Sequence, residues 1–316
     1  GADHERGEGD SGFAGGKGGG VHGLLLFVTE LRKPRSRGCH VQDLRCVVVA
    51  RASAAPRHYS SFMLQRVRDS GSGQVESFEI VEGPATSRYI IVCDHASNAI
   101  PPEYGSLGLD PVQLQRHIAY DIGADALTRA LAKEMAAPAV LSRFSRLLID
   151  PNRGDDDPTL VMKLSDGAIV PGNARAGDAE AAKRIARFSA PYHAAIDRVI
   201  DRSLAAGVHP ILFSVHTFTP LFHDGPRPWH CSVLWEKDDR FALPLLEALR
   251  AEPDIVTGEN EPYVGALKGD SMTRHGFDRG LPHAIIEVRQ DLLDDAADIS
   301  AWVMRFSRIL TGLAVK

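Results

Sequence analysis

The chain has 316 residues, of which 44% are hydrophobic and 24% are charged, a composition typical of a globular protein with one large core. Its formal net charge of −5 gives no general attraction for the phosphate backbone of nucleic acids or for an anionic membrane surface. No apolar run approaches the roughly 20 residues that a membrane-spanning helix needs. We therefore expect a protein that binds neither nucleic acid nor membrane.

The N-terminal region differs in composition from the remainder of the chain. It begins with a Gly-rich segment and continues through an Arg-rich, nearly acid-free stretch from Arg32 to Arg68, without a regular hydrophobic period. Such composition seldom packs into a core. We expect residues 1–75 to be a disordered or non-native extension, with Met63 as a plausible native start, and residues 76–316 to form a single domain.

From Ser77 onward, apolar strand-like runs alternate with amphipathic helical segments, the pattern of a layered α/β fold. Strands are predicted at residues 77–81, 88–93, 139–144, 147–149, 210–215, 232–235, 255–257 and 283–288. Helices are predicted at residues 111–135, 179–206, 240–250 and 296–313. Pro191 predicts a kink or break in the second helix, because proline lacks the backbone donor.

The four cysteines lack the spacing of a disulfide framework or a zinc knuckle. We interpret them as reduced thiols, which predicts a cytoplasmic protein. Cys93 lies beside Asp94 and His95, so a nucleophilic cysteine has to be considered. Because Cys93 ends an apolar run, a small core residue is the favoured interpretation.

The first polar cluster follows the strand predicted at residues 88–93. His95 and Asn98 lie three residues apart there, where a tight turn can direct both side chains to one metal ion. Asn98 is a neutral and therefore weaker ligand. The alternative is an ordinary polar loop in which the Asp and Asn side chains bind the backbone.

Two further polar residues end apolar strands. In an open α/β sheet the carboxyl ends of separate strands meet at one crevice, so His216, which follows residues 211–215, can lie beside His95. Two imidazoles predict zinc or another divalent metal. Glu287 ends a buried strand, where a carboxylate is costly without a partner. We expect it to take a proton from metal-activated water.

Other residues are candidates for substrate binding. Arg289 lies two residues beyond Glu287 and could hold a carboxylate or a developing oxyanion, or it could form an ion pair with Glu287. Arg146, Asn152 and Arg153 could bind an anionic substrate, although the arginines could also be surface residues.

Three further candidates lie elsewhere in the chain. Asp121 is four residues from His117, which favours a hydrogen bond on a helix surface but leaves Asp121 open as a third metal ligand. Thr217 adjoins His216 and is a candidate substrate contact. Tyr263 lies in a Gly-containing loop at residues 259–279 that is typical of a pocket lid.

Six motifs in order resemble the N-formylglutamate amidohydrolase family, at residues 93–98, 117–124, 150–153, 214–220, 260–263 and 287–292. The resemblance implies a three-layer α/β fold with a central mixed sheet between helices, of the phosphorylase/hydrolase type and similar to zinc carboxypeptidases. It also implies the family's named reaction, the release of formate from N-formyl-L-glutamate in histidine breakdown.

The resemblance also implies roles for individual residues. His95 and His216 would be metal ligands, Asn98 or Asp121 the third, and Glu287 the general base and acid, with the substrate carboxylates held by Arg153 and Arg289. Carboxypeptidase-type sites have Glu at the position of Asn98.

We therefore expect a zinc-dependent, or other divalent-metal-dependent, amidohydrolase of a small anionic N-acyl amino acid. A homo-oligomer is compatible with this. The alternatives are a hydrolase of another amide, such as a peptide or cell-wall linkage, and a non-catalytic small-molecule binding protein that has lost its metal.

Overall fold

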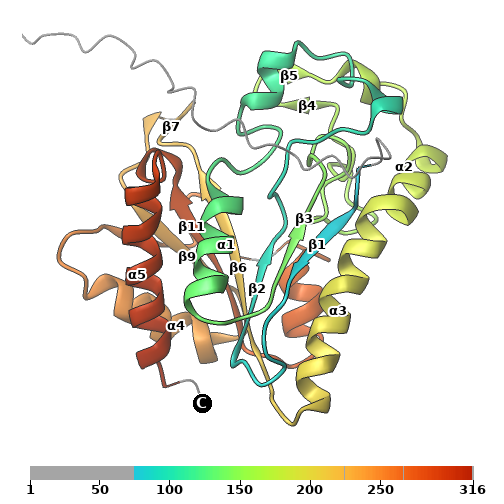
Figure 1. The fold of residues 1–316 in the computed structure, drawn as a ribbon. Coiled ribbons are helices and arrows are strands. Elements are labelled where there is room, and N and C mark those ends of the chain that lie inside the picture. The colour runs from blue at the N-terminus through green and yellow to red at the C-terminus, as the bar shows by residue number, and fades with distance from the viewer. Residues whose placement is uncertain (1–74, 224, 266, 315–316) are drawn as a thin grey trace, which may run out of the picture. The chain divides into compact units, whose positions relative to one another are not determined.

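The structure is a computed structural model that describes residues 75–223, 225–265 and 267–314, all within one compact unit of the chain (Figure 1). The predicted extension, residues 1–75, lies outside the described residues apart from Val75, so that expectation stays a prediction. In these described ranges no helix is both long enough and apolar enough to cross a membrane.

A seven-stranded mixed sheet forms the centre of this unit, in the order β1-β3-β2-β6-β11-β9-β10. Strands β3, β2, β6 and β11 are parallel, whereas β1 is antiparallel to β3, and β9 is antiparallel to β11 and parallel to β10. The strands are β1 (Phe78–Val81), β2 (Tyr89–Cys93), β3 (Ala139–Ser142), β6 (Ile211–Phe218), β9 (Cys231–Leu234), β10 (Thr257–Glu259) and β11 (His283–Arg289).

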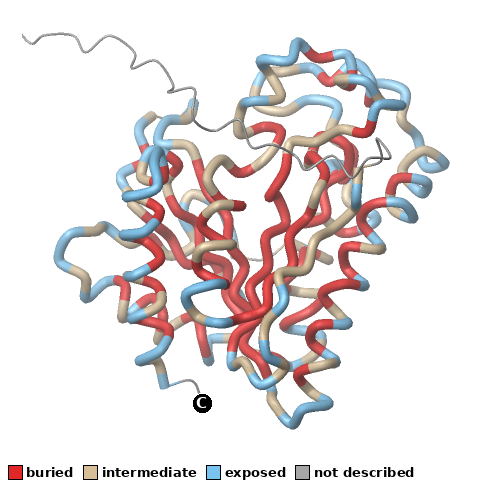
Figure 2. The backbone as a smooth tube through the Cα atoms, viewed as in Figure 1, coloured by how far each residue is buried: buried red, intermediate tan, exposed pale blue. Residues whose placement is uncertain are grey.

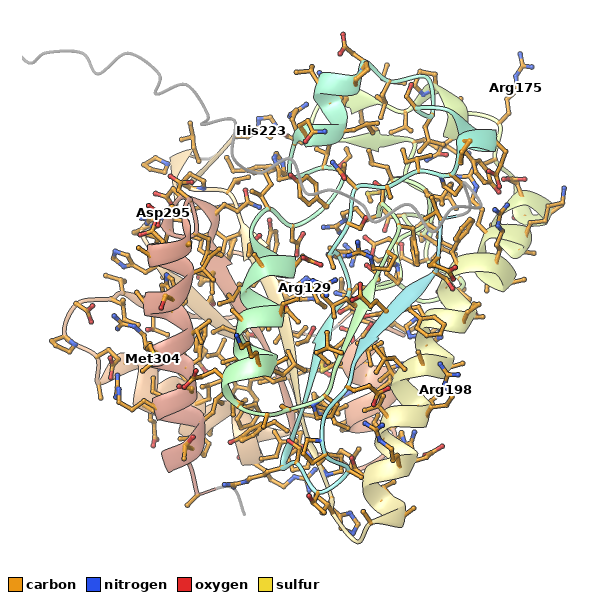
Figure 3. The ribbon with its side chains drawn as sticks, viewed as in Figure 1. Arg129, Arg175, Arg198, His223, Asp295 and Met304 are labelled. Carbon is orange, nitrogen blue, oxygen red and sulfur yellow. The ribbon has the colours of Figure 1, made fainter. Side chains whose placement is uncertain are left out.

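Helices cover both faces of the sheet, which confirms the expected α/β fold with a central mixed sheet (Figure 1). One face carries α1 (Ala124–Glu134), α4 (Asp239–Arg250) and α5 (Ala296–Gly312), and the other carries α3 (Ala190–Ala205), which follows α2 (Asp178–Arg184). The start of α5 is capped by Asp295, whose Oδ1 accepts from the backbone nitrogens of Ala297 at 2.8 Å and Asp298 at 2.9 Å (Figure 3).

The central strands are buried on both faces, as their continuous apolar sequences require (Figure 2). Alternate residues of β2 point to opposite faces, so Ile91 and Cys93 join the core under α1, α4 and α5, while Ile90 and Val92 join the core under α3. Burial raises the pKa of the Cys93 thiol well above its ordinary value. Cys93 is therefore a core residue and not a nucleophile.

Two predicted helices are interrupted in the structure. The helix expected at 111–135 is a short 3₁₀ turn, η2 (Pro111–Gln115), and then α1, which starts only after Gly123 at φ 87°. The intervening turn carries Asp121. The helix expected at 179–206 contains a π-helical turn, η4 (Ile185–Ser189), between α2 and α3, because Pro191 lacks the N–H that a continuous helix would need.

Short elements surround the carboxyl ends of the central strands. Two hairpins were not predicted, β4 (Leu164–Ser165) with β5 (Ala168–Ile169), and β7 (Leu221–Phe222) with β8 (Gly225–Pro226). His223, beside β7, reaches the first hairpin through Asp166, with Nε2 2.9 Å from Asp166 Oδ1 (Figure 3). The strand expected at 147–149 is instead a buried turn. The remaining short helical turns are η1 (Pro102–Tyr104), η3 (Pro171–Asn173), η5 (Thr273–Phe277) and η6 (Gln290–Leu292).

Candidate metal centre and active-site cavity

The predicted polar side chains meet at the carboxyl ends of three neighbouring parallel strands. His95 lies two residues beyond β2, and His216 of β6 is paired in register with Glu287 of β11. These three side chains and Asp121 line one cavity of about 530 Å³. The sheet order β2-β6-β11 therefore brings together residues that are far apart in the sequence.

His95, Asp121 and His216 form a buried group whose ligand atoms lie within 4.8 Å of one another. Asp121 Oδ2 is 2.9 Å from His216 Nδ1 and 3.4 Å from His95 Nδ1. The two imidazole rings stand edge to face, with centroids 4.9 Å apart. Each ring therefore directs its Nδ1 towards the same carboxylate.

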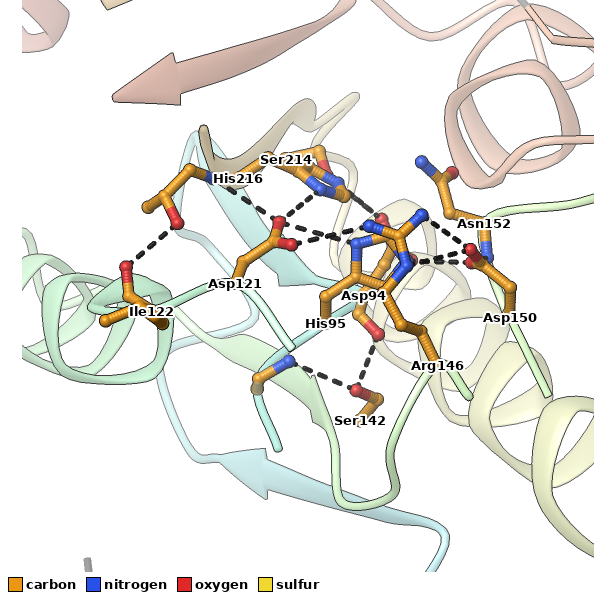
Figure 4. Close-up of polar contacts among 12 residues, drawn as sticks. Asp94, His95, Asp121, Ile122, Ser142, Arg146, Asp150, Asn152, Ser214 and His216 are labelled. Carbon is orange, nitrogen blue, oxygen red and sulfur yellow. Dashed lines mark hydrogen bonds and ion pairs between the residues drawn. The ribbon is translucent and has the colours of Figure 1, made fainter. Parts of the chain in front are cut away.

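A second carboxylate lies behind each imidazole (Figure 4). Asp150 Oδ1 is 2.7 Å from His95 Nε2, and Asp94 Oδ2 is 3.1 Å from His216 Nε2. A carboxylate that accepts from one ring nitrogen fixes the tautomer and leaves the other nitrogen with a free lone pair, the usual arrangement behind a metal-binding histidine. The sequence prediction did not assign this role to Asp94 or Asp150, although both lie within the motifs that it used.

Asp94 is itself held by three elements. Tyr192 Oη of α3 donates to it at 2.9 Å, Ser214 Oγ of β6 donates at 3.2 Å, and Ser271 Oγ donates from the loop before η5. Burial would raise the pKa of Asp94, but the hydrogen bond and charge of His216 hold it well below its ordinary value. Asp94 therefore stays ionised and keeps the His216 ring in one orientation.

Asp150 and Asp121 are likewise ionised despite their burial. The positive charge of Arg146, whose Nη2 is 2.7 Å from Asp150 Oδ2, holds the pKa of Asp150 well below its ordinary value. The charge of His95 and the hydrogen bond from His216 likewise hold the pKa of Asp121 well below its ordinary value. Burial alone would raise both values, so these partners outweigh desolvation.

This donor set fits a divalent cation. Two imidazole nitrogens and one carboxylate oxygen are the protein ligands of many catalytic zinc sites, which keep a further position for water or substrate. The surrounding carboxylates add negative charge that a cation would balance. Across the part of the chain that the structure describes, no other three His, Cys, Asp or Glu side chains converge in this way.

Glu287 is the buried carboxylate beside this group. It is 6% exposed, and its Oε2 has no hydrogen-bond partner among the described residues. Burial raises the pKa of Glu287 to about 7, and the charge of Asp121 adds to this effect, whereas His216 opposes it. A carboxyl with a pKa near neutrality can both accept and return a proton at physiological pH.

The structure places Asp121, rather than Asn98, beside the two imidazoles. Asn98 does not line the cavity, and its Nδ2 donates to the carbonyl oxygen of Leu114 at 2.8 Å. This bond is the backbone-binding alternative that the sequence left open. The sequence left Asp121 open as a third ligand but placed it on a helix, whereas in the structure it lies in the turn that ends at Gly123, with its side chain towards the histidines.

Arg289 lies outside the cavity and pairs with neither Glu287 nor a cavity-lining group. Its Nε donates to Asp291 Oδ1 at 2.8 Å, and its Nη1 donates to the carbonyl oxygens of Arg227 and Trp229. These carbonyls precede the first residue of β9. Val288 is the last residue of β11 that pairs with β9. The side chain of Arg289 therefore extends beyond the paired part of these two strands, which places its guanidinium away from Glu287.

The other predicted substrate-binding residues line the cavity: Arg146, Asn152, Arg153, Thr217 and Tyr263. Arg146 is engaged by Asp150. Arg153 donates to Thr159 Oγ1 and to the carbonyl oxygen of Asn152, and forms no ion pair with any described carboxylate. Arg153 is therefore a cavity-lining cation without an ion-pair partner among the described residues.

Three of these side chains are held by neighbouring groups. Asn152 Oδ1 accepts from the backbone nitrogen of Ser271 at 3.0 Å, and Tyr263 Oη accepts from Arg227 Nη1 at 3.3 Å. Thr217 Oγ1 donates to the carbonyl oxygen of Ile122 at 2.8 Å. The loop at 259–279 thus contributes to the cavity wall, as the sequence predicted for a pocket lid.

A layered α/β unit with two histidines, an aspartate and a buried glutamate at the ends of its central strands has the arrangement of a metallohydrolase site. Comparison with known proteins agrees on a hydrolase. Residues 87–293 match the sequence model of N-formylglutamate amidohydrolase. Because this match covers more than half of the chain, the protein belongs to the N-formylglutamate amidohydrolase family.

Two individual relatives are each less than 30% identical in sequence to this chain. An N-formylglutamate deformylase of Pseudomonas putida is 27% identical over 159 residues, which cover 46% of the chain and only 58% of that relative. A crystal structure of a gene product of Agrobacterium tumefaciens is similar with a TM-score of 0.72 and 29% identity, over 77% of this chain and 97% of that one.

The crystal structure of N-formylglutamate amidohydrolase from Ralstonia eutropha has a TM-score of 0.57 and 18% identity, over 76% of this chain and all of that one, and shows the fold alone.

Proposed function

We propose that the protein is a metal-dependent amidohydrolase that cleaves the amide bond of a small N-acyl amino acid, most simply an N-formyl amino acid. N-Formyl-L-glutamate, which appears in the names of two relatives, is the first substrate to test. The observation that carries the proposal is the buried group of His95, Asp121 and His216 beside the unpartnered carboxylate of Glu287.

His95, Asp121 and His216 would hold the cation. Zinc suits two imidazoles and one carboxylate, and other divalent metals share these ligands. When bound, the cation supplies Lewis acidity, which polarises a carbonyl group and makes water more acidic. Asp94 and Asp150 contribute by keeping the two imidazole rings in a fixed tautomer and orientation.

Glu287 moves the proton. Its carboxylate accepts a proton from the attacking water as the new carbon–oxygen bond forms, and returns this proton to the amide nitrogen as the carbon–nitrogen bond breaks. The products are a carboxylate, formate in the simplest case, and a free amino acid. The pKa of about 7 supports this double role near neutral pH.

Arg153 binds the substrate's α-carboxylate. It lines the same cavity as Glu287 and has no ion-pair partner among the described residues, whereas Arg146 is engaged by Asp150. Asn152, Thr217 and Tyr263 add hydrogen-bonding groups to this wall. A planar guanidinium suits a carboxylate because it can donate two parallel hydrogen bonds.

The test combines metal content with formate release. Elemental analysis of the purified parent should give close to one equivalent of metal, which His95→Ala and His216→Ala should lose. Glu287→Gln should keep the metal and lose at least about 100-fold in turnover of N-formyl amino acids, because general acid–base catalysis typically contributes 10²- to 10⁴-fold. Unchanged turnover in Glu287→Gln would refute its role.

Two other functions predict different results in the same experiment. A hydrolase of peptide or cell-wall amides would bind metal but release no formate, and would turn over a panel of peptides instead. A non-catalytic binding protein would bind small molecules in a manner unaffected by a chelator. The family match and the buried histidine–aspartate group favour the amidohydrolase.

A further inference from the structure

Leu234, Leu267 and Ile285 give apolar side chains to the cavity that Glu287 also lines, and these three residues are called the apolar subsite below. Ile285 lies two residues before Glu287 on β11 and therefore faces the same side of the sheet. Leu234 of β9 is its partner in the antiparallel ladder. Although Leu234 is only 4% exposed and Ile285 only 5%, both line the cavity. The sheet thus offers an apolar floor beside the proposed proton carrier.

Leu267 lines the cavity from a loop that also contacts the residue after β9. Gly265 packs so tightly on Trp235, the residue after β9, that a Cβ at position 265 would lie 2.0 Å from the Trp235 carbonyl oxygen. The backbone nitrogen of Leu267 also donates to Asp270 Oδ2 at 2.9 Å. Gly265 therefore lies against the carboxyl end of β9, and Asp270 holds the backbone of Leu267.

The charges around the cavity provide for one substrate carboxylate and not for two. Arg146 and Arg153 are the only arginine or lysine side chains among the described residues that line it, and Arg146 already neutralises Asp150. Asp121, Asp166, Asp270 and Glu287 line it as well. Asp166 is neutralised by Arg116, whose Nη2 lies 2.6 Å from its Oδ2. A second substrate carboxylate would therefore meet the other carboxylates or the apolar subsite, and burying it there without a cation of its own is costly.

Arg227 contacts side chains of the cavity wall but does not itself line the cavity. It is 6% exposed, does not line the cavity, and its guanidinium stacks on the rings of Phe222 at 4.7 Å and Tyr263 at 5.3 Å. Its Nη1 donates to Thr219 Oγ1 and Tyr263 Oη. Arg227 thus packs on the aromatic side chains of the wall rather than facing the cavity directly, and its buried Nε has no hydrogen-bond partner among the described residues.

We infer that the amidohydrolase site selects N-acyl amino acids with one carboxylate and an uncharged, apolar side chain, such as those of leucine or methionine, over glutamate. This inference rests on the proposed function and specifies its substrate class. The α-carboxylate binds Arg153, the acyl carbonyl lies at the His95, Asp121 and His216 group, and the side chain occupies the apolar subsite.

The size of the cavity is consistent with a bulky side chain. N-Formylglutamate has about a dozen non-hydrogen atoms and would fill roughly 250 Å³ at the packing density of a protein interior. The cavity of about 530 Å³ is therefore larger than this substrate requires. Size alone does not exclude glutamate, so the charge distribution decides the preference.

A matched substrate panel tests the inference on the metal-loaded full chain. N-Formyl-L-leucine, N-formyl-L-glutamine and N-formyl-L-glutamate are compared by kcat/KM, the last two having nearly the same shape but different charge. We expect leucine to exceed glutamate by at least tenfold, with glutamine between them. A kcat/KM for N-formyl-L-glutamate equal to or above that for N-formyl-L-leucine would overturn the inference.

A charge added within the subsite should change this order. Leu267→Arg is expected to raise the glutamate-to-leucine ratio of kcat/KM at least tenfold, whereas Leu267→Gln, which is polar but uncharged, should not. Leu221→Arg adds the same charge to β7 at a residue that is 65% exposed and does not line the cavity, and should leave the ratio near that of the parent. An unchanged ratio in Leu267→Arg would remove Leu267 from the subsite.

Binding to the Glu287→Gln variant separates this inference from the proposed function. Calorimetry would measure the affinities of N-formyl-L-leucine and N-formyl-L-glutamate without hydrolysis. Tighter binding of the leucine compound, combined with no turnover by the parent, would leave the subsite standing and refute the amidohydrolase. Equal or tighter binding of the glutamate compound, or binding of neither, would refute the subsite.

Discussion

Replacing Glu287 by glutamine should make the metal-free protein more stable, although it lowers turnover of the metal-loaded protein at least about 100-fold. The carboxylate of Glu287 is buried, its Oε2 has no hydrogen-bond partner among the described residues, and its pKa is raised to about 7. Glutamine has nearly the same shape and carries no charge. The substitution therefore removes the cost of an ionised carboxylate in this environment.

The magnitude follows from the pKa of Glu287. Raising it from 4.5 to about 7 makes ionisation less favourable in the folded protein by about 3 kcal/mol, at about 1.4 kcal/mol per pKa unit. Between pH 4.5 and 7 the folded state binds more protons than the unfolded state, so this cost develops as the pH rises through that window and is complete above it. The advantage of Glu287→Gln should thus be near zero at pH 4.5 and about 3 kcal/mol at pH 8.

Urea unfolding of chelator-treated protein, followed by circular dichroism at both pH values, measures this difference. For a unit of this size, about 3 kcal/mol corresponds to a rise in Tm of roughly 6 to 12 °C. Glu134→Gln, at an exposed position on α1, is the matched control and should change stability little at either pH. A Glu287→Gln variant no more stable than the parent at pH 8 would refute the account of Glu287 as an uncompensated buried charge.

Four other substitutions test the surrounding structure. Asp94→Asn or Asp150→Asn should weaken metal binding 10- to 100-fold, measured by competition with a chromogenic chelator, because each orients one imidazole. Asn98→Ala should retain the metal content of the parent, and loss of metal would restore Asn98 as a ligand. Gly265→Ala should cost at least about 2 kcal/mol in unfolding free energy, since its Cβ would overlap the Trp235 backbone, and wild-type stability would contradict that packing.

The short polar segments that follow buried strands were enough to predict the centre of the site from the sequence. His95, His216 and Glu287 were predicted to meet because the carboxyl ends of parallel strands share one edge of a sheet, and β2, β6 and β11 are neighbours in that sheet. Carboxylates were harder to assign. Asp94 was seen only as a neighbour of His95, since nothing in a strand-end motif says which group will stand behind an imidazole.

The length of one side chain and the position of one turn explain why the structure differs from the sequence prediction at Arg289 and Asp121. Alternation along β11 suggested that Arg289 shares a face with Glu287, but its long side chain finds backbone carbonyls that precede β9. Asp121 was placed on a helix because the apolar period runs through residues 111–135. The left-handed conformation of Gly123, which delays the start of α1, depends on tertiary contacts that the sequence pattern does not contain.

Some residues of the site lie on central strands and others on loops, and these two parts of the structure differ in local stability. His216 and Glu287 lie on β6 and β11, central strands buried on both faces, whose amide hydrogens should exchange with solvent only when the whole unit opens. Arg153, Tyr263 and Leu267 lie on loops, which open locally at lower free energy. If the proposed function is right, substrate would enter and leave through loop fluctuations, while the residues at the bottom of the cavity keep their relative positions.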